Sequence, residues 1–205
     1  MGHYLSFVAF CAVLAFAPGP DSFLTLRSTV AGGRSRGLWT TLGISVAGAV
    51  QGLLAASGLG AVIQHARPVF ETIRWAGVAY LLYLGFLALR AAARGLEGSW
   101  DSGPAGGRSR WRALRQGFLC NITNPKVLAF NLAVLPQFVG ARASLPTLCV
   151  YALTLTGVGI VALLCIITAA SAARRVVESR RVRRGIEAGT GLVFVGFATV
   201  LAADS

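Results

Sequence analysis

Charged residues are scarce in this 205-residue chain, and acidic ones are scarcer still. Only 13% of the residues are charged, whereas a soluble domain usually carries about a quarter. There are 19 basic residues and 7 acidic ones, which gives a formal net charge of +12. Such an excess would suit nucleic-acid binding, but a nucleic-acid-binding domain also needs a polar surface around its basic patch. The composition therefore excludes an ordinary cytosolic enzyme, argues against a nucleic-acid partner, and predicts a polytopic membrane protein.

Motifs of catalytic and metal sites are missing as well. No HExxH, GxSxG, P-loop or dinucleotide fingerprint occurs, so we expect neither an enzyme nor a cofactor. His3 and His65 have no partner motif, so we expect no metal site. The cysteines lie in apolar stretches without CxxC spacing, which is typical of free thiols that serve as small hydrophobic residues. They are Cys11, Cys120, Cys149 and Cys165.

Apolar sequence makes up most of the chain. A bilayer core about 30 Å thick needs roughly 20 mostly apolar residues for each helical span. We identify six candidate stretches: residues 4–26, 38–63, 75–93, 117–139, one within 143–173, and 185–203. We therefore predict an all-α integral membrane protein with six transmembrane helices, forming one domain over residues 1–205. The first stretch is interpreted as a retained span, because it lacks the basic start of a signal peptide.

The distribution of basic residues predicts the orientation of these spans. The first, third and fifth loops contain 15 basic residues, the second and fourth loops contain 3, and Lys126 lies inside a span. Short loops rich in arginine and lysine stay cytoplasmic, so both termini are expected on the periplasmic or extracellular side. The arginine-rich loops are expected to attract anionic lipids. A glycine-rich cytoplasmic linker is expected at about residues 96–112.

The linker separates two halves of three spans each, about residues 1–95 and 113–205. An odd number of spans per half makes an inverted repeat topologically natural. The first span of each half is interrupted, by Pro18-Gly19-Pro20-Asp21 and by Asn124-Pro125-Lys126. Interrupted segments at corresponding positions of two halves indicate the binding site of a transporter. A helix that restarts at such a proline offers free N–H groups and a positive dipole end to an anion.

Asp21 and Lys126 are the ionisable residues of these interruptions. Such residues cost several kcal/mol inside a membrane unless they are paired or hydrated. In a structural interpretation, Asp21 caps a helix, Asn124 caps the restarted one, and Lys126 snorkels or pairs with Asp21. In a functional interpretation, Lys126 and the helix ends hold a carboxylate while Asp21 faces an ammonium group. That arrangement suits an amino acid, and Asp21 could also carry a coupling proton.

Further polar and small residues fall in the predicted spans. Asn121, Asn131 and Gln137 could line the same cavity, or they could form hydrogen bonds between helices. Gly48 and Gly52 permit close helix packing, either within one chain or across a homodimer.

Short motifs follow one another in a fixed order along the chain. Besides Pro18–Pro20 and Asn124–Lys126, they are Gly37-Leu38, Gly43-Ile44, Gly58-Leu59-Gly60, Gly77 to Gly85, Gly117-Phe118 and Leu135 to Val139. This order resembles the LysE/RhtB family of bacterial amino-acid exporters, whose Pro-Gly-Pro and Asn-Pro-Lys motifs map onto the first two segments. The resemblance covers nearly the whole chain and implies a six-span inner-membrane exporter of amino acids or related metabolites, driven by the proton motive force.

These observations favour a secondary active exporter that takes a small amino-acid-like substrate. The predicted pathway residues are Pro18, Gly19, Pro20, Asp21, Asn121, Asn124, Pro125, Lys126 and Gln137. Two alternatives remain open: a passive small-solute channel, and an exporter of metal or toxic ions from a related superfamily. The spans contain no His/Cys/Asp cluster of the kind that binds metals, which argues against an exporter of metal ions.

Overall fold

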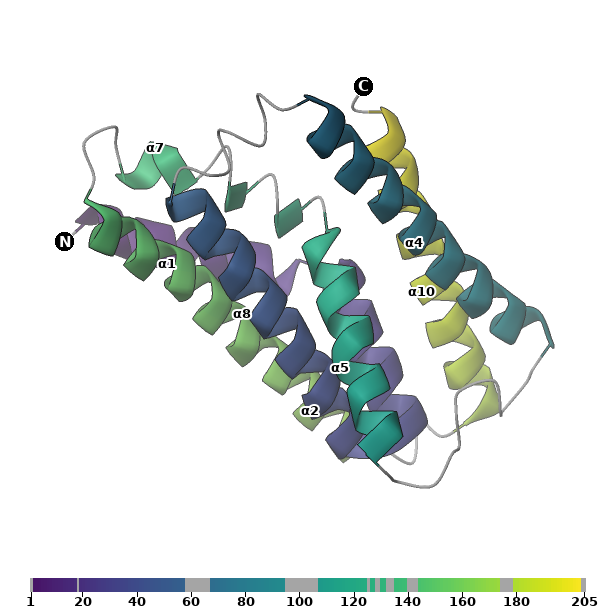
Figure 1. Cartoon of the computed structure of the whole chain (residues 1–205). Coiled ribbons are helices and arrows are strands. Elements are labelled where there is room, and N and C mark those ends of the chain that lie inside the picture. Colours follow the sequence, from purple (N-terminus) through teal and green to yellow (C-terminus); the bar gives the residue numbers. More distant parts are fainter. Residues whose placement is uncertain are drawn as a thin grey trace.

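The computed structural model is all-helical over the residues that it describes. These residues are 2–17, 19–57, 67–94, 107–124, 126–127, 130–131, 135–139, 144–173 and 179–203, and no strand occurs among them. The prediction of an all-α protein is therefore confirmed for this part of the chain. The helices are α1 (Gly2–Phe16), α2 (Pro20–Ala56), α4 (Arg67–Arg94), α5 (Gly107–Ile122), α7 (Leu135–Val139), α8 (Leu145–Ala172) and α10 (Arg180–Ala203) (Figure 1).

A sharp turn at Gly33 divides α2 into two arms. Its backbone angles (φ 75°, ψ −179°) lie in a region that is accessible essentially to glycine alone. The two arms fold back on each other, and Gly37 therefore lies close to Thr29. A Cβ atom built on Gly37 would touch the threonine side chain. The apolar stretches on either side predict a loop over residues 27–37. The structure differs because helical backbone continues on both sides of one permissive glycine.

Glycines let α2 approach its neighbours closely. A Cβ atom on Gly43 would collide with the carbonyl group of Leu114 in α5, and one on Gly117 would collide with the carbonyl group of Thr40. Gly52 faces Ala152 of α8, where an added Cβ atom would come within 2.9 Å of the alanine side chain. Of the two alternatives for the Gly48/Gly52 pair, the structure therefore shows packing within one chain.

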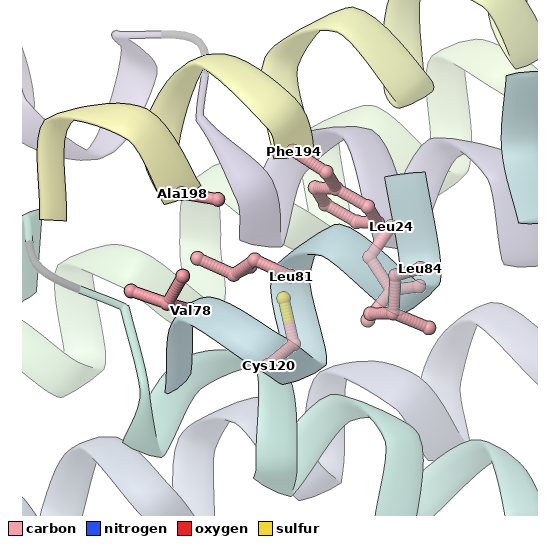
Figure 2. Close-up of a cluster of buried hydrophobic side chains, with 7 residues drawn as sticks. All are labelled: Leu24, Val78, Leu81, Leu84, Cys120, Phe194 and Ala198. Carbon is pink, nitrogen blue, oxygen red and sulfur yellow. The ribbon is translucent and has the colours of Figure 1, made fainter. Parts of the chain in front are cut away.

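Two apolar clusters hold the helices together. The larger one joins α2, α4, α5 and α10, and its side chains are drawn in Figure 2: Leu24, Val78, Leu81, Leu84, Cys120, Phe194 and Ala198. The second brings Phe7 and Cys11 of α1 against Phe130, Leu135 and Ala152. All four cysteines lie in described helices and are free thiols, as predicted.

Much of the outer surface of the helices is apolar. Val13 is 74% exposed, Leu5 is 68% exposed and Leu192 is 66% exposed. Extended apolar surface of this kind marks contact with a membrane or a partner. Among the described helices, α2 and α8 are each long and apolar enough to cross a bilayer, and shorter apolar stretches run over Tyr4–Phe16 and Val78–Ala93.

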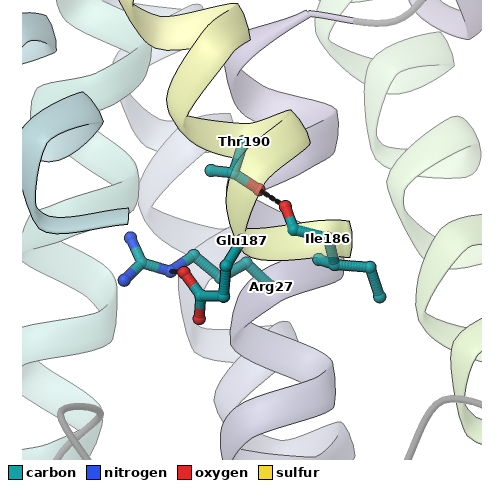
Figure 3. Close-up of polar contacts among 4 residues, drawn as sticks. All are labelled: Arg27, Ile186, Glu187 and Thr190. Carbon is teal, nitrogen blue, oxygen red and sulfur yellow. Dashed lines mark hydrogen bonds and ion pairs between the residues drawn. The ribbon is translucent and has the colours of Figure 1, made fainter. Parts of the chain in front are cut away.

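Basic residues from the first and fifth predicted loops meet at one end of the molecule. Arg27 of α2 forms an ion pair with Glu187 of α10, with 3.3 Å between Nε and Oε2 (Figure 3). Arg183 donates a hydrogen bond to the carbonyl group of Val30, at 3.3 Å. Arg27 was expected in a loop, but it lies in a helix and is only 6% exposed. Its burial is compatible with its charge because Glu187 neutralises it. The start of α1 and the end of α10 lie at the opposite end (Figure 1).

Candidate functional site

Two interruptions of the helical chain come into contact inside the molecule. The first lies between α1, which ends at Phe16, and α2, which begins at Pro20. The second follows the end of α5 at Ile122, and residues 126–127 are again helical. The Nζ atom of Lys126 donates a hydrogen bond to the carbonyl oxygen of Ala17 at 2.8 Å, although 109 positions separate them along the chain.

Each interruption has its own local geometry. Gly19 is the N-cap residue of α2, with extended backbone angles (φ −162°, ψ −178°), and no side chain in the described part of the chain forms a capping hydrogen bond there. Asp21 lies in the first turn, so the structural interpretation in which Asp21 caps the helix does not apply. In the second interruption, Oδ1 of Asn124 accepts a hydrogen bond from the backbone N–H of Lys126 at 3.1 Å. Asn124 therefore has the capping role predicted for it.

The carboxyl group of Asp21 is held by amide donors from the other half of the chain. Its Oδ2 atom accepts hydrogen bonds from Nδ2 of Asn121 at 2.9 Å and from Nδ2 of Asn124 at 2.7 Å. Its Oδ1 atom is buried and has no hydrogen-bond partner among the residues that the structure describes. Hydrogen bonds to a charged group are roughly twice as strong as neutral ones, so the two amides favour the carboxylate. The carboxylate therefore keeps unused acceptor capacity at Oδ1.

Lys126 is placed over the start of α2. A Cβ atom built on Gly19 would lie 3.7 Å from both Cδ and Nζ of Lys126. The ammonium group donates to Ala17 and forms no ion pair with Asp21, both residues being described. The ammonium group and the positive end of the α2 dipole lie side by side. Both attract an anion, and neither neutralises the other.

Both charged residues line one cavity of about 90 Å³. A cavity needs only about 10–15 Å³ to hold a water molecule, so this one has room for a small ligand group. Its polar wall comes from the two interruptions, and its apolar wall comes largely from one face of α8. The lining residues are Leu14, Ala15, Gly19, Asp21, Ser22, Ile44, Ser45, Gly48, Asn121, Asn124, Lys126, Val127, Leu155, Thr156, Gly159, Ile160 and Leu163.

Comparison with known proteins assigns the chain to a protein family. The model of the LysE type translocator family matches residues 12–205, which is nearly the whole chain. The chain belongs to the LysE type translocator family. Its members are membrane transporters and not enzymes.

Two relatives illustrate the range of this translocator family. A leucine efflux protein of Klebsiella pneumoniae is 29% identical over 203 residues, which cover 98% of this chain and 94% of the relative. A homoserine/homoserine lactone efflux protein of Salmonella typhi is 31% identical over 143 residues, which cover 66% of this chain and 64% of the relative. No solved structure matches this translocator.

The predicted pathway residues of this translocator divide into three groups. Five of them line the cavity together: Gly19, Asp21, Asn121, Asn124 and Lys126. Pro20 is buried as the first residue of α2, and Gln137 belongs to α7, although its side chain lies outside the described part. Pro18 and Pro125 also lie outside the described residues.

Sequence reasoning missed the contribution of α8. Leu155, Thr156, Gly159, Ile160 and Leu163 recur at three- and four-residue spacing and supply one wall of the cavity. Other small and polar residues of α8, such as Thr154 and Gly157, do not line the cavity, so residue type alone did not distinguish this face. No group of three or more metal-binding side chains occurs within the described ranges of this translocator.

Proposed function

We propose that this translocator is a secondary active exporter of amino acids or related small metabolites across the bacterial inner membrane, coupled to protons. The main support is that Lys126 and Asp21 line one cavity without pairing with each other. A cation and an anion held apart in this way complement a zwitterion. The names of the relatives, which describe leucine efflux and homoserine efflux, favour the same class of substrate.

The substrate carboxylate would bind at the ammonium group of Lys126. That group lies beside the uncapped start of α2, where free N–H groups and the helix dipole add to the attraction for an anion. The substrate ammonium group would bind at Oδ1 of Asp21, the oxygen that the two asparagines leave unused.

The substrate side chain would then lie against the apolar wall. Ile44, Leu155 and Leu163 offer aliphatic surface, and Thr156 is the polar group beside them. Such a surface suits a small aliphatic side chain better than a charged one, because a buried unpaired charge is costly. The leucine efflux function named for the Klebsiella relative agrees with this choice.

Asp21 would also bind the coupling proton. In the ionised form it attracts the substrate ammonium group from the cytoplasmic side. On the outer side a proton binds to the carboxylate, removes its charge, and so releases the substrate. The protonated site returns inward and loses its proton to the cytoplasm, so that one proton enters as one substrate leaves. An inverted repeat of three spans plus three spans, each half beginning with a broken helix, supplies the two opposed states in many transporters.

Reconstituted vesicles test this proposal. The full-length protein is placed in liposomes loaded with a panel of amino acids, and efflux is followed with and without an imposed proton gradient. We expect the gradient to accelerate efflux of small aliphatic amino acids, and an uncoupler to remove the acceleration. Lys126→Ala should abolish efflux, and Asp21→Asn should leave residual efflux that ignores the gradient. Thr190→Ala, at a buried position that does not line the cavity, is the matched control.

Three results would contradict the proposal. If no amino acid leaves faster than from Lys126→Ala vesicles, the substrate class is wrong. If efflux persists unchanged after the uncoupler is added, the protein is a passive channel. If Asp21→Asn retains full gradient-driven efflux, Asp21 is not the proton site.

A further inference from the structure

A second and larger cavity lies near the basic end of the molecule. Its volume is about 450 Å³, which is within the usual range of about 300–1,000 Å³ for small-molecule sites. It lies between α2, α4 and α5, and shares no lining residue with the cavity that holds Asp21 and Lys126. The residues around it are Arg27, Arg36, Tyr80, Tyr83, Leu84, Leu87, Arg112, Arg115, Gln116 and Leu119.

The charge of this arginine cavity is strongly positive. Two guanidinium groups come from α2 and two from α5. Glu187 pairs with Arg27, and Arg36 and Arg112 also take part in interactions of their own, so part of this positive charge is compensated within the protein. An anion bound between guanidinium groups reduces their mutual repulsion, and Arg112 and Arg115 are exposed and therefore accessible to such an anion. Guanidinium groups also match the geometry of phosphate oxygens, which they bind through two hydrogen bonds at once.

The remaining walls are aromatic and aliphatic. Leu84, Leu87 and Leu119 lie beside the arginines, and Leu84 also belongs to the larger apolar cluster. A free inorganic anion gains nothing from apolar walls. A phospholipid can contact both parts of the cavity, because its phosphate group suits the arginines and its acyl chains suit the leucines. Tyr83 is 59% exposed on the outer side of α4, so the cavity borders the surface that faces the membrane.

The packing of α4 leaves room for such a molecule. This helix packs extensively on α10 and touches α5 only sparsely, although both α4 and α5 contribute to the larger apolar cluster. The hydroxyl group of Tyr80 donates a hydrogen bond to the carbonyl oxygen of Gln116 at 3.4 Å, beside the cavity. A lipid seated here would add contacts between α4 and α5.

We propose that the arginine cavity binds the phosphate group of an anionic phospholipid. Basic cavities between membrane helices on the cytoplasmic side are known to hold lipid headgroups, and this end is the one expected to face the cytoplasm. Arg36, Arg112 and Arg115 surround the phosphate, and the acyl chains leave past Leu87. This site is separate from the amino-acid site, and it stands whether or not the exporter proposal is correct.

The test uses the full-length protein and two double variants of equal charge. Arg112→Gln/Arg115→Gln removes two guanidinium groups from the arginine cavity. Arg110→Gln/Arg184→Gln removes two exposed arginines from the same end of the molecule and is the control. Each protein is titrated in detergent with phosphatidylglycerol, phosphatidylcholine or inorganic phosphate, and bound lipid is counted by native mass spectrometry alongside the melting temperature.

We expect phosphatidylglycerol to bind the unmodified protein and the control about equally well. The cavity variant should bind it at least tenfold more weakly, because it loses two guanidinium groups that contact the phosphate directly, whereas the control loses only general surface charge. Phosphatidylcholine and inorganic phosphate should have little effect on any of the three. A second variant, Leu87→Trp, keeps every charge and narrows the apolar side, and it should also weaken phosphatidylglycerol binding.

Two outcomes would overturn the proposal. Equal losses in the cavity variant and the control would mean that the lipid is attracted by general surface charge. Stabilisation by inorganic phosphate that matches the lipid effect, and that is lost in the cavity variant, would make this a site for a free anion. Leu87→Trp decides the matter if the double arginine variant does not fold, because unchanged lipid binding in Leu87→Trp also contradicts the proposal.

Discussion

Asn124 connects the two interruptions of the chain through a single side chain. Its amide nitrogen donates to Oδ2 of Asp21 at 2.7 Å, and its amide oxygen accepts from the backbone of Lys126 at 3.1 Å. An asparagine can do both because it carries a donor and an acceptor on one planar group. An aspartate could still cap the helix, but it would offer no donor to Asp21. The residue type thus follows from the two contacts that it makes.

The ion pair between Arg27 and Glu187 provides a prediction at the residue scale. The two side chains are 6% and 13% exposed, so removal of one partner leaves the other charge buried. We expect Arg27→Met and Glu187→Met each to lower the free energy of unfolding by about 3–5 kcal/mol. The double variant should lie within about 1 kcal/mol of the original protein, because an apolar pair often replaces a buried ion pair without loss.

Equilibrium unfolding of the purified protein in mixed micelles measures these differences. Arg110→Met, at an exposed position, is the control and should change stability by less than about 0.5 kcal/mol. Additive losses in the double variant would mean that the two residues stabilise the fold independently of each other.

At the scale of elements, the second arm of α2 determines how closely the halves of the molecule meet. It packs on α5 through Gly43 and Gly117, and on α8 through Gly52. In the same arm, the side-chain amide of Gln51 donates a hydrogen bond to the carbonyl oxygen of Asn121 at 2.8 Å, near the end of α5. The same arm contributes Ile44, Ser45 and Gly48 to the cavity. Helix spacing and cavity shape are therefore coupled, because both depend on small residues along one helix face.

Substitution of Gly43 tests this coupling. An added methyl group would meet the carbonyl group of Leu114, which is backbone and has little freedom to move. We expect Gly43→Ala to destabilise the protein by about 1–3 kcal/mol, as overpacking usually does. The matched control is Gly157→Ala in α8, where an added Cβ atom meets nothing within 4 Å. That control should be neutral or stabilising by about 0.5–1 kcal/mol.

Thermal unfolding in detergent, compared at fixed protein and lipid concentrations, distinguishes the two glycine variants. Similar melting temperatures for both would show that α2 and α5 can separate without cost, contrary to the close packing of this interface.

At the scale of the whole molecule, charge is sorted by position. Basic residues that are far apart in the chain gather at one end, and the start of α1 and the end of α10 lie at the other (Figure 1). The arginine cavity lies close to the basic end, whereas the cavity with Asp21 and Lys126 forms where the helices are interrupted. This separation of charge matches the arginine count of the loops, which predicts the basic end on the cytoplasmic side.

Reporter fusions test that orientation. Alkaline phosphatase, which is active only outside the cytoplasm, should be active when fused after Ser205. The same enzyme should be inactive when fused within residues 96–106, and green fluorescent protein should give the reverse pattern. Cell fluorescence and phosphatase activity, normalised to the amount of fusion protein, provide the measurement. Fluorescence from a fusion after Ser205 would show that the termini are cytoplasmic.

A large part of this description was accessible from composition and motif order. The shortage of charge and the apolar runs predicted an all-α membrane protein, and the Pro-Gly-Pro and Asn-Pro-Lys motifs predicted the family, which the match over residues 12–205 confirmed. Five residues of the predicted pathway line one cavity because helix interruptions can be recognised locally, from proline and its neighbours. The assignment of these residues to transport remains a prediction.

Other features depend on contacts between distant segments, which no local pattern encodes. The 103 positions between Asp21 and Asn124 carry no sign that one side chain will donate to the other. The pairing of Arg27 with Glu187, the turn at Gly33 and the wall supplied by α8 likewise arise only when the helices pack. Burial in a low-dielectric interior favours polar groups that find a partner, and the identity of that partner depends on which helices become neighbours. Local chemistry therefore established which residues can act, and packing established which of them meet.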